Sequence, residues 1–509
     1  MVLWIVFRVK AGRSFFYEKR GILCHFFGFL QNLLNYFFGF LQKSYIFIFG
    51  FLQKAVKMYF NRLIDRYLKE WANSPKHKPL LLRGARQVGK SSAVRHLGEN
   101  FEHMVEINFE KHPEFKAVFT TNLDVSRIVS ELSAITGTPI VAGKTLLFLD
   151  EIQGCVDAIM SLRFFKEDMP DLHVVAAGSL LEFALNDIPT FGVGRIHSMF
   201  MHPMTFDEFL EANGQMALLK VRNQSSPQKP LPQTVHDKLV EYFRTYMLVG
   251  GMPESVVRWV QSHNYLECQA IQDDILVTYE DDFAKYKKKV DPTLLRKTFR
   301  SIASQITHKF TYSKVGEYRT EKVQEALHLL TLAGLAIPVA RSSANGLPLG
   351  SEADSGTQKV LLLDPGLQLR LQNLNLGDIS EIVSQILTAS GADLVNKGAL
   401  AEMVAGLEIL RYKTPNIRHE IFYWSRTERN SLAEVDYLDA RNARVTPIEV
   451  KAGTQGGMKS LWIMMREKKL TNAYRCSLEN FGEFDYVDSL DNNAIRHVEI
   501  CPLYALSQM

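Results

Sequence analysis

The hydrophobic positions in the first half of the chain follow a helical period first and strand-like runs afterwards. Within residues 58–71, MYFNRLIDRYLKEW, five apolar or aromatic residues share one helical face: Leu63, Ile64, Tyr67, Leu68 and Trp71. Apolar runs then occur at residues 80–82, within 144–151 and at 172–177. Continuous apolar runs are typical of parallel strands that are buried on both faces. The pattern therefore predicts an α/β fold with a parallel sheet.

The second half of the chain predicts a different arrangement. Residues 293–339 predict three helices and then an apolar strand, a layout that resembles a winged helix. Residues 294–304 form the first expected helix, Ser313 caps a short second one, and the third spans 321–333 and ends at Gly334. Two more strands, in AEVDYL and VTPIEVKAG, are expected to form a hairpin near the end of the chain.

Residues 1–57 differ from the rest of the chain. The segment from Gly21 to Gln42 contains no Asp, Glu, Lys or Arg and is long enough to form a membrane-spanning helix. A phrase ending in FGFLQ recurs three times with an 11-residue period, which is unusual for such a helix. We expect translation to start at Met58 and residues 1–57 to be translated repeat DNA outside the fold. The alternatives are an amphipathic or membrane anchor over residues 21–53 and a packed extension.

Composition and charge exclude several classes of protein and of binding site. The 509 residues are 46% hydrophobic, which excludes a disordered chain. The net charge of +4 is too small to indicate a nucleic-acid partner by itself. The five cysteines form no CxxC pair, so neither a disulfide framework nor a zinc site is predicted, and a cytoplasmic location is expected. These cysteines are Cys24, Cys155, Cys268, Cys476 and Cys501.

A phosphate-binding loop is predicted after the first apolar run. The segment GARQVGKS fits GxxxxGK[ST] and lies between a strand and a helix, as that pattern requires. Glycines let the backbone wrap around an anion, and N–H groups at the helix start face its phosphates. Lys90 is expected to reach the β and γ phosphates, and Ser91 to bind Mg²⁺. The expected ATP-binding residues are Gly84, Ala85, Arg86, Gln87, Val88, Gly89, Lys90, Ser91 and Ser92.

Polar residues end the two later apolar runs. Asp150 is expected to hold Mg²⁺ together with Ser91, and Glu151 to orient and activate the attacking water. A simple helix cap is the alternative for this acidic pair. The third run ends at Gly178 and Ser179, so Ser179 should lie beside the γ-phosphate in a parallel sheet and sense it.

These motifs, with LLFLDEIQ, VVAAGSLLE and GRIHSMFMHPMTFDEF, resemble a prokaryotic branch of the AAA-type ATPases over roughly residues 59–212. The resemblance implies an ATP hydrolase in which an arginine, often from a neighbouring subunit, completes the γ-phosphate site. Arg195 is expected in that role, with Arg86 and Arg163 as competitors, and a homo-oligomer is thereby implied. Residues 242–259 match the helical lid of this branch, although their Gly-Gly pair fits a structural turn equally well.

The predicted winged helix raises the question of a DNA partner. Such a fold can place its third helix in a major groove, and four basic residues are available for phosphates: Lys309, Lys314, Arg319 and Lys322. Glu317, Glu321 and Glu325 share that surface and oppose DNA binding. A packing or protein-contact role is the alternative, and the basic run at residues 285–289 is typical of a solvated face.

A second group of chemically active residues is predicted near the C-terminus. Asp436 lies in AEVDYL, Glu449 and Lys451 lie in PIEVKAG, and Glu402 precedes them in a helix. Residues two apart on a strand share a face and hairpin strands are adjacent, so these side chains can converge. Glu402, Asp436 and Glu449 are expected to bind a second Mg²⁺, with Lys451 activating a water for attack on a phosphodiester. A surface ion pair between Glu449 and Lys451 is the alternative.

With KVLLLDPGL, GALAEMVAGLEIL and CPLYAL, this pattern resembles a restriction-endonuclease-like domain of unknown function that commonly follows this ATPase. The expected domains are an apolar N-terminal segment, a P-loop ATPase domain, a helical lid with linker, a winged helix and a restriction-endonuclease-like α/β domain. Their expected ranges are 1–57, 58–215, 216–290, 291–375 and 376–509. The expected protein is an ATPase whose nucleotide state controls this C-terminal module, with DNA as a candidate target. The alternative is a nucleotide-dependent switch that recruits a protein partner and cleaves nothing.

Overall fold

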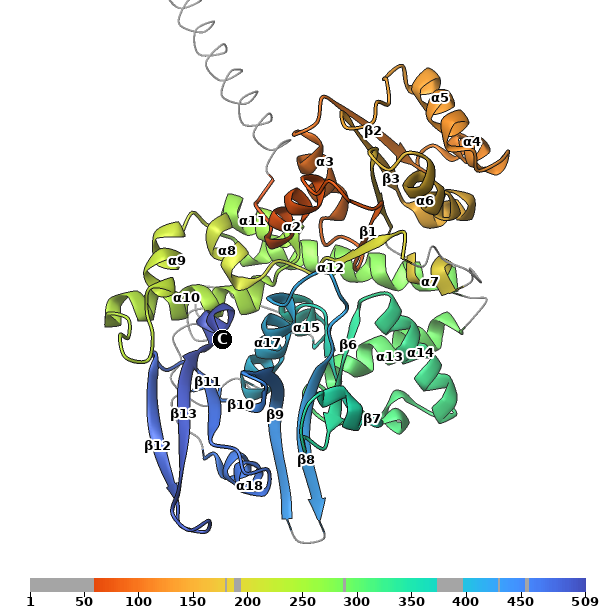
Figure 1. The fold of residues 1–509 in the computed structure, drawn as a ribbon. Coiled ribbons are helices and arrows are strands. Elements are labelled where there is room, and N and C mark those ends of the chain that lie inside the picture. The colour runs from red at the N-terminus through yellow and green to blue at the C-terminus, as the bar shows by residue number, and fades with distance from the viewer. Residues whose placement is uncertain are drawn as a thin grey trace, which may run out of the picture. The chain divides into compact units, whose positions relative to one another are not determined.

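The computed structural model describes residues 59–178, 181–186, 194–286, 290–372, 397–428, 431–453 and 457–509. Phe60–Met509 form one compact unit, and the strands in it make two sheets (Figure 1). Within the described ranges, no helix is both long enough and apolar enough to cross a membrane. The expectations for residues 1–57, including an anchor over 21–53, fall outside the described residues.

The first sheet has five parallel strands in the order β2-β3-β4-β1-β5. The strands are β1 (Leu80–Arg83), β2 (His103–Asn108), β3 (Thr145–Asp150), β4 (His173–Ala177) and β5 (His197–Phe200). The three apolar runs of the sequence form β1, β3 and β4, which confirms the predicted parallel sheet. Every residue of β3 and β4 is buried, because both faces of these strands are packed.

Helices connect these strands. They are α2 (Leu63–Ala72), α3 (Lys90–Gly98), α4 (Lys116–Thr120), α5 (Val125–Thr136), α6 (Val156–Asp168) and α7 (Leu181–Asn186), with short 3-10 turns η2 (Pro113–Phe115) and η3 (Ile152–Gly154). In α2, Ile64, Leu68 and Trp71 are buried, which confirms the predicted helix and its apolar face. Residues of α5 and α6 pack on the strands in one hydrophobic core. Each fully buried Leu, Ile or Phe in that core contributes about 1.5–3 kcal/mol.

Five helices follow the first sheet. They are α8 (Phe206–Ala212), α9 (Met216–Asn223), α10 (Gln233–Val249), α11 (Pro253–Ser262) and α12 (Tyr265–Asp282), followed by η4 (Phe283–Tyr286). The turn between α10 and α11 contains Gly250, at φ 74° and ψ −174°. A Cβ there would lie 2.2 Å from Asp364 Oδ1, and the N–H of Gly251 donates to Asp364 Oδ2 at 2.6 Å. These contacts support the structural-turn interpretation of the glycine pair.

The three predicted helices after residue 290 are present. They are α13 (Pro292–Ser304), η5 (Tyr312–Val315) and α14 (Thr320–Leu332), followed by β6 (Ala336–Ser342), η6 (Leu349–Glu352), β7 (Ala353–Leu362) and α15 (Pro365–Leu371). Gly334, at φ 74°, follows the end of α14 as predicted. The expected cap at Ser313 is wrong, because Ser313 lies inside η5. Thr311 precedes that turn with the extended backbone that an N-cap residue requires.

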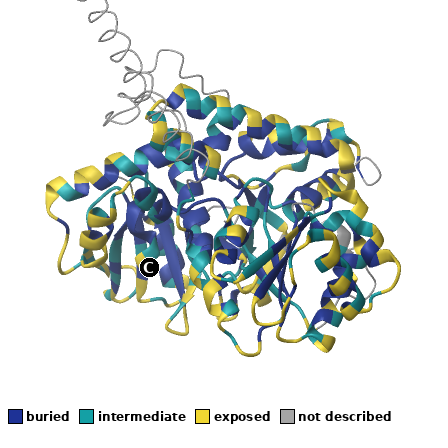
Figure 2. Ribbon diagram, turned by 90° about the horizontal axis from the view of Figure 1, so that it is seen from above, coloured by how far each residue is buried: buried dark blue, intermediate teal, exposed yellow. Residues whose placement is uncertain are grey.

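The second sheet has eight strands in the order β12-β13-β11-β10-β9-β8-β6-β7. Its remaining elements are α17 (Lys397–Arg411), β8 (Ile421–Glu428), β9 (Ser431–Arg441), β10 (Arg444–Val450), α18 (Lys459–Glu467), β11 (Asn472–Ser477), β12 (Gly482–Asp488), β13 (Ala494–Pro502) and η7 (Leu503–Gln508). β9 and β10 are antiparallel neighbours, which confirms the predicted hairpin. Much of each sheet is buried, while the outer faces of many helices are exposed (Figure 2).

Candidate functional site

The loop between β1 and α3 has a strongly curved backbone. Gly84, Gln87 and Gly89 have positive φ values of 144°, 65° and 100°. A Cβ at Gly84 would lie 2.2 Å from the carbonyl oxygen of Met201, so only glycine fits there. Because α3 begins at Lys90, the N–H groups of its first turn point towards the loop. This strand–loop–helix arrangement is the one that the sequence predicts for a phosphate site.

The ammonium group of Lys90 lies inside this loop. Its Nζ donates to the carbonyl oxygens of Gly84 and Ala85 at 2.9 and 2.8 Å. Burial lowers the pKa of Lys90 to about 8, although Glu151 and Asp150 favour its charged form. A lysine held in this way can be transferred from carbonyl oxygens to phosphate oxygens by a small rotation of its side chain.

Ser91 and Asp150 meet at the carboxyl end of the first sheet. Ser91 Oγ donates to Asp150 Oδ1 at 3.0 Å, and Asn108 Nδ2 donates to Oδ2 at 3.0 Å. Burial raises the pKa of Asp150, and the hydrogen bond from Ser91 opposes that rise. A hydroxyl and a carboxylate side by side are the ligand types that Mg²⁺ uses in nucleotide sites.

Glu151 has a left-handed backbone, with φ 50° and ψ 44°. Its Oε2 accepts a 2.6 Å hydrogen bond from Gln153 Nε2. Gln153 also covers Gly178, where a Cβ would lie 2.0 Å from Gln153 Oε1. Gln153 therefore joins the acidic end of β3 to the end of β4. Ser179, the expected γ-phosphate sensor, is the next residue and lies outside the described residues.

The outer side of the loop contacts later parts of the chain. Arg86 donates to both carboxylate oxygens of Asp282 at 2.9 and 2.7 Å, and its carbonyl oxygen accepts from Tyr279 Oη at 2.8 Å. Gly334, after α14, lies so close to the loop that a Cβ there would be 3.2 Å from the nitrogen of Ala85. Two elements beyond the ATPase segment thus contact the loop directly. Arg86 is bound to α12, and Ser92 is exposed.

Arg62 is a residue that sequence reasoning missed. Its Nη1 donates to the Val88 carbonyl oxygen at 2.8 Å, and its Nε donates to Glu208 Oε1 at 3.0 Å. Both side chains of the Arg62–Glu208 pair are less than 10% exposed. No motif covers residue 62, and the available signal was Glu208 in HPMTFDEF, since a buried carboxylate needs a cationic partner.

Arg195 precedes β5, at the end of the parallel sheet opposite to the loop of its own chain. Its Nε is 3.0 Å from Glu167 Oε1, near the end of α6, and half of its side chain is exposed. β5 begins two residues later, and His197 pairs with Leu80 at the start of β1. The loop follows the other end of β1, so Arg195 lies at the opposite edge of the sheet. Arg163, its competitor, contacts the same Glu167.

The second predicted group comes together around two lysines. Lys451 Nζ donates to Glu449 Oε1 at 2.6 Å, and Asp436 Oδ2 accepts from the N–H of Val450 at 2.8 Å. The alternative ion pair between Glu449 and Lys451 is present, but Glu449 is buried rather than on the surface. Glu402 is bound by Lys359, the first residue of KVLLLDPGL, for which the sequence pattern predicts no such role. Burial, reinforced by the charge of Asp436, raises the pKa of Glu402 to about 8 and that of Glu449 to about 7.

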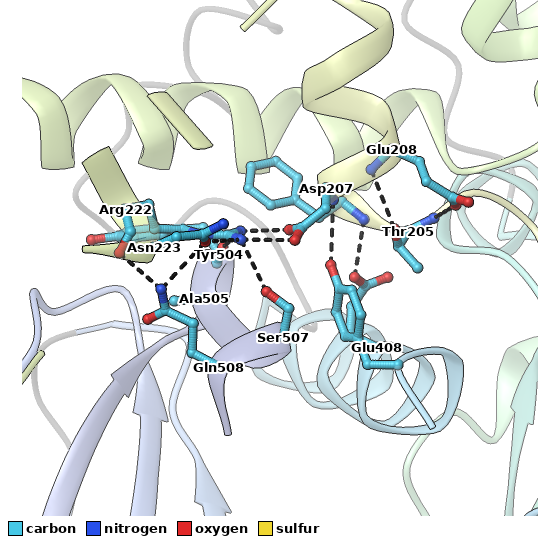
Figure 3. Close-up of polar contacts among 12 residues, drawn as sticks. Thr205, Asp207, Glu208, Arg222, Asn223, Glu408, Tyr504, Ala505, Ser507 and Gln508 are labelled. Atoms are coloured by element: carbon cyan, nitrogen blue, oxygen red, sulfur yellow. Dashed lines mark hydrogen bonds and ion pairs between the residues drawn. The ribbon is translucent and has the colours of Figure 1, made fainter. Parts of the chain in front are cut away.

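A polar interface joins the ATPase segment to the helix that carries Glu402 (Figure 3). Glu408 of α17 accepts from the N–H of Phe206 at 3.0 Å and from Tyr246 Oη at 2.8 Å. Beside it, Arg222 donates to Asp207 Oδ2 at 2.7 Å and to the carbonyl oxygen of Tyr504 at 2.8 Å. The start of α8 is therefore bound directly to α17, and through Arg222 of α9 it is linked to η7.

Comparison with known proteins identifies the N-terminal part. Residues 76–210 match a family model described as an AAA domain, and residues 240–378 and 397–497 match two models described as domains of unknown function, DUF8612 and DUF4143. No curated protein matches the chain. The AAA match shows that residues 76–210 are an AAA-type ATPase domain, which is a nucleotide-binding domain.

Three solved structures are distantly similar. The Walker-type ATPase paby2304 of Pyrococcus abyssi is 16% identical, with a TM-score of 0.39 over 62% of this chain and 96% of its own. The ORC1 protein of Aeropyrum pernix, solved in complex with DNA, is 13% identical, with a TM-score of 0.28 over 62% and 92%. Cdc6p from Pyrobaculum aerophilum is 12% identical, with a TM-score of 0.22 over 64% and 92%.

Proposed function

We propose that this protein hydrolyses ATP at the loop of residues 84–92 and that its nucleotide state controls the C-terminal module. Lys90 and the N–H groups at the start of α3 bind the β and γ phosphates. Ser91 and Asp150 hold Mg²⁺, which neutralises charge on the phosphates when bound. Their hydrogen-bonded oxygens support this role, because both are hard oxygen ligands at one point of the sheet edge.

Glu151 orients and deprotonates the attacking water in this proposal. Its hydrogen bond from Gln153 restricts the carboxylate and supports a fixed direction of attack. Ser179 and Arg195 complete the contacts to the γ-phosphate. Since Arg195 lies at the opposite sheet edge from its own loop, it serves the nucleotide of a neighbouring subunit. A homo-oligomer is therefore part of the proposal.

The contacts of Arg62 are the observation that supports coupling between the loop and α17. Arg62 contacts the loop at Val88 and Glu208 on α8 at the same time, and both contacts are buried. Two residues before Glu208, the N–H of Phe206 is bound by Glu408 on α17. A shift of the loop on nucleotide exchange would therefore be felt at α17 through three consecutive contacts.

The C-terminal module has a winged helix and a restriction-endonuclease-like domain in this proposal. α13, η5 and α14 followed by the antiparallel pair β6–β7 support the first assignment. The second is supported by the succession of α17, three antiparallel strands β8–β10, α18 and the parallel neighbour β11. The expected boundaries at residues 215, 290 and 375 belong to the same proposal.

Two targets are proposed for this module, DNA and a protein partner. DNA is reached through the exposed start of α14 and its basic residues. The ion pair of Lys322 with Glu325, at 2.9 Å, favours the protein partner, because it neutralises one of the four basic residues on this surface.

Hydrogen exchange of α17 tests the coupling. Amide hydrogen exchange of the Glu151→Gln variant is measured once with ATP and once with ADP, and we expect the exchange of residues 397–411 to differ between the two nucleotides. Arg62→Met should remove that difference, whereas Arg66→Met should not. Arg66 is a matched control because it lies in α2, the helix that begins directly after Arg62, but pairs only weakly with Glu70 on the surface. Identical exchange in both nucleotides would overturn the coupling.

Duplex DNA then separates the two targets. ATP turnover that rises with DNA, together with salt-sensitive DNA affinity that Arg319→Ala and Lys322→Ala weaken, supports DNA. Turnover that ignores DNA supports the switch that recruits a protein partner.

A further inference from the structure

Lys359 is a charged side chain in the interior of the C-terminal module. It lies on β7, and its side chain is 1% exposed. Its Nζ donates to Glu402 Oε1 at 2.8 Å and lies 2.6 Å from Glu434 Oε1. The ring of Tyr423 lies 5.0 Å from the same Nζ. The ammonium group of Lys359 is therefore enclosed by two carboxylates and an aromatic ring.

This cation belongs to a compact cluster of opposite charges. The cluster contains four carboxylates and two lysines: Glu402, Glu434, Asp436, Glu449, Lys359 and Lys451. Glu402 and Glu449 are largely withdrawn from water, with side chains 14% and 6% exposed, and such carboxylates require cations or hydrogen bonds at close range. In metal-dependent nucleases this requirement is met by a divalent ion. Here two ammonium groups are already in contact with the carboxylates.

The three expected metal ligands are each committed to another partner. Glu402 is bound by Lys359, Glu449 by Lys451, and Asp436 by the N–H of Val450. Across the described ranges, no three His, Cys, Asp or Glu side chains are grouped so that they could hold a metal ion. A divalent ion bound at Glu402 would also repel the ammonium group of Lys359, which lies 2.8 Å from Glu402 Oε1. The residues therefore do not fit the expected second Mg²⁺ site.

We propose that the ammonium group of Lys359 occupies the place of a divalent ion in this carboxylate cluster, so that the nuclease-like domain is a metal-free scaffold that does not cleave nucleic acid. This inference rests on the restriction-endonuclease-like fold proposed above. It assigns the cluster a structural role: Lys359 joins β7 to α17 and to β9. Since α17 also carries Glu408, the cluster fixes the first half of the helix that contacts the ATPase domain.

Binding of Mn²⁺ to the full chain tests the inference. The P-loop site is first removed with Ser91→Ala and Asp150→Asn, and free Mn²⁺ is followed by electron paramagnetic resonance. We expect no stoichiometric Mn²⁺ binding by this chain when Lys359 is present, and no cleavage of duplex or single-stranded DNA by the unmodified chain in Mg²⁺ or Mn²⁺. Stoichiometric binding that Asp436→Asn abolishes, or cleavage that Asp436→Asn abolishes, would overturn the proposal.

Replacing Lys359 provides the converse test. Lys359→Met leaves its carboxylates without a cation, so the melting temperature should fall by several degrees and Mn²⁺ should restore part of the loss. Lys413→Met is the matched control, because Lys413 also pairs with a carboxylate, Asp439, at a more exposed position. If Lys359→Met does not fold, the double variant Lys359→Met with Glu402→Gln should fold better than Lys359→Met alone. Equal stability of all these chains without any metal would contradict the proposal.

ATP turnover, measured on the same protein preparations, separates a failure of the proposed ATPase from a failure of the proposed metal-free cluster. If Lys359→Met loses DNA-independent ATP turnover only because the chain unfolds, that loss does not contradict the proposed ATP hydrolysis. A well-folded unmodified chain with no turnover contradicts the ATPase and leaves the Mn²⁺ result valid.

Discussion

The hydroxyl group of Ser91 lies 3.0 and 3.1 Å from the two carboxylate oxygens of Asp150. This contact joins the second residue of α3 to the last residue of β3. Neither residue needs the other for its secondary structure, since Ser91 lies in a helix and Asp150 ends a strand. The contact places a hydroxyl group beside a carboxylate at the end of the sheet, and both are oxygen ligands of the kind that the proposed Mg²⁺ site requires.

Removal of Lys90 or Glu151 tests catalysis directly. Glu151→Gln keeps the shape of the side chain but removes the base, so kcat should fall by about 10²–10⁴-fold while ATP binding persists. Lys90→Ala should lose binding as well, because the phosphates lose their cation. Magnesium-dependent phosphate release and nucleotide binding are measured on both. Lys144→Ala, which removes only an exposed ion pair with Glu102, is the control. Full turnover in Glu151→Gln would contradict its role.

The position of Arg195 predicts complementation between subunits. Arg195→Ala and Lys90→Ala chains should each be inactive, but a mixture should regain part of the turnover. In the mixture an intact loop from one chain meets an intact arginine from the other. Turnover is measured at increasing ratios, with light scattering to establish the oligomer. A mixed oligomer without any turnover would contradict action between subunits.

The first sheet and the phosphate loop were predictable because their signals are local. Continuous apolar runs determine β1, β3 and β4, and the glycine spacing of the loop determines which backbone positions can have positive φ. Asp150 follows from its place at the end of an apolar strand. These features need only neighbouring residues, so one sequence contains them.

The long-range partners could not be predicted in the same way. Arg62 and Glu208 are separated by 146 residues, and Lys359 and Glu402 by 43. Their pairing depends on how helices and strands pack, which no local period reports. The wrong cap position at Ser313 has a related cause. In so short a turn, the packing of the neighbouring chain decides which residue has the extended backbone of a cap. Asp436 and Glu449 lie on the predicted strands and Glu402 lies in the predicted helix, whereas Lys451 lies just after the strand predicted to contain it. The contact between Lys359 and Glu402 is not predictable from these local patterns.

Gly250 predicts a stability effect with two separable parts. Gly250→Ala should lower the free energy of unfolding by about 2–4 kcal/mol, because it adds backbone strain and places a methyl group against Asp364. Gly214→Ala is the matched control: its φ is 72°, but nothing lies within 4 Å of the added Cβ. That variant should lose only about 1–2 kcal/mol. Denaturant unfolding measures both, and equal losses would exclude the contact with Asp364 as a cause.

The buried state of Lys90 predicts that ATP binding depends on pH. With a pKa of about 8 in the nucleotide-free protein, Lys90 is charged at pH 7 and mostly neutral at pH 9. Phosphates require the charged form, so binding at pH 9 must take up a proton. The affinity should fall by up to about tenfold per pH unit above 8. Calorimetry in buffers of different ionisation enthalpy measures that proton directly.

The same group has the opposite effect on the stability of the nucleotide-free protein. Its pKa is lower in the folded state than the ordinary 10.5, so the unfolded chain binds more protons between pH 8 and 10.5. The contribution of Lys90 to the unfolding free energy therefore rises with pH in the range where ATP affinity falls. Lys90→Arg keeps its charge across this range, so its affinity, although weaker, should not change with pH. Proton uptake of zero at pH 9 in the unmodified protein would show that Lys90 is already charged there, and would remove both effects together.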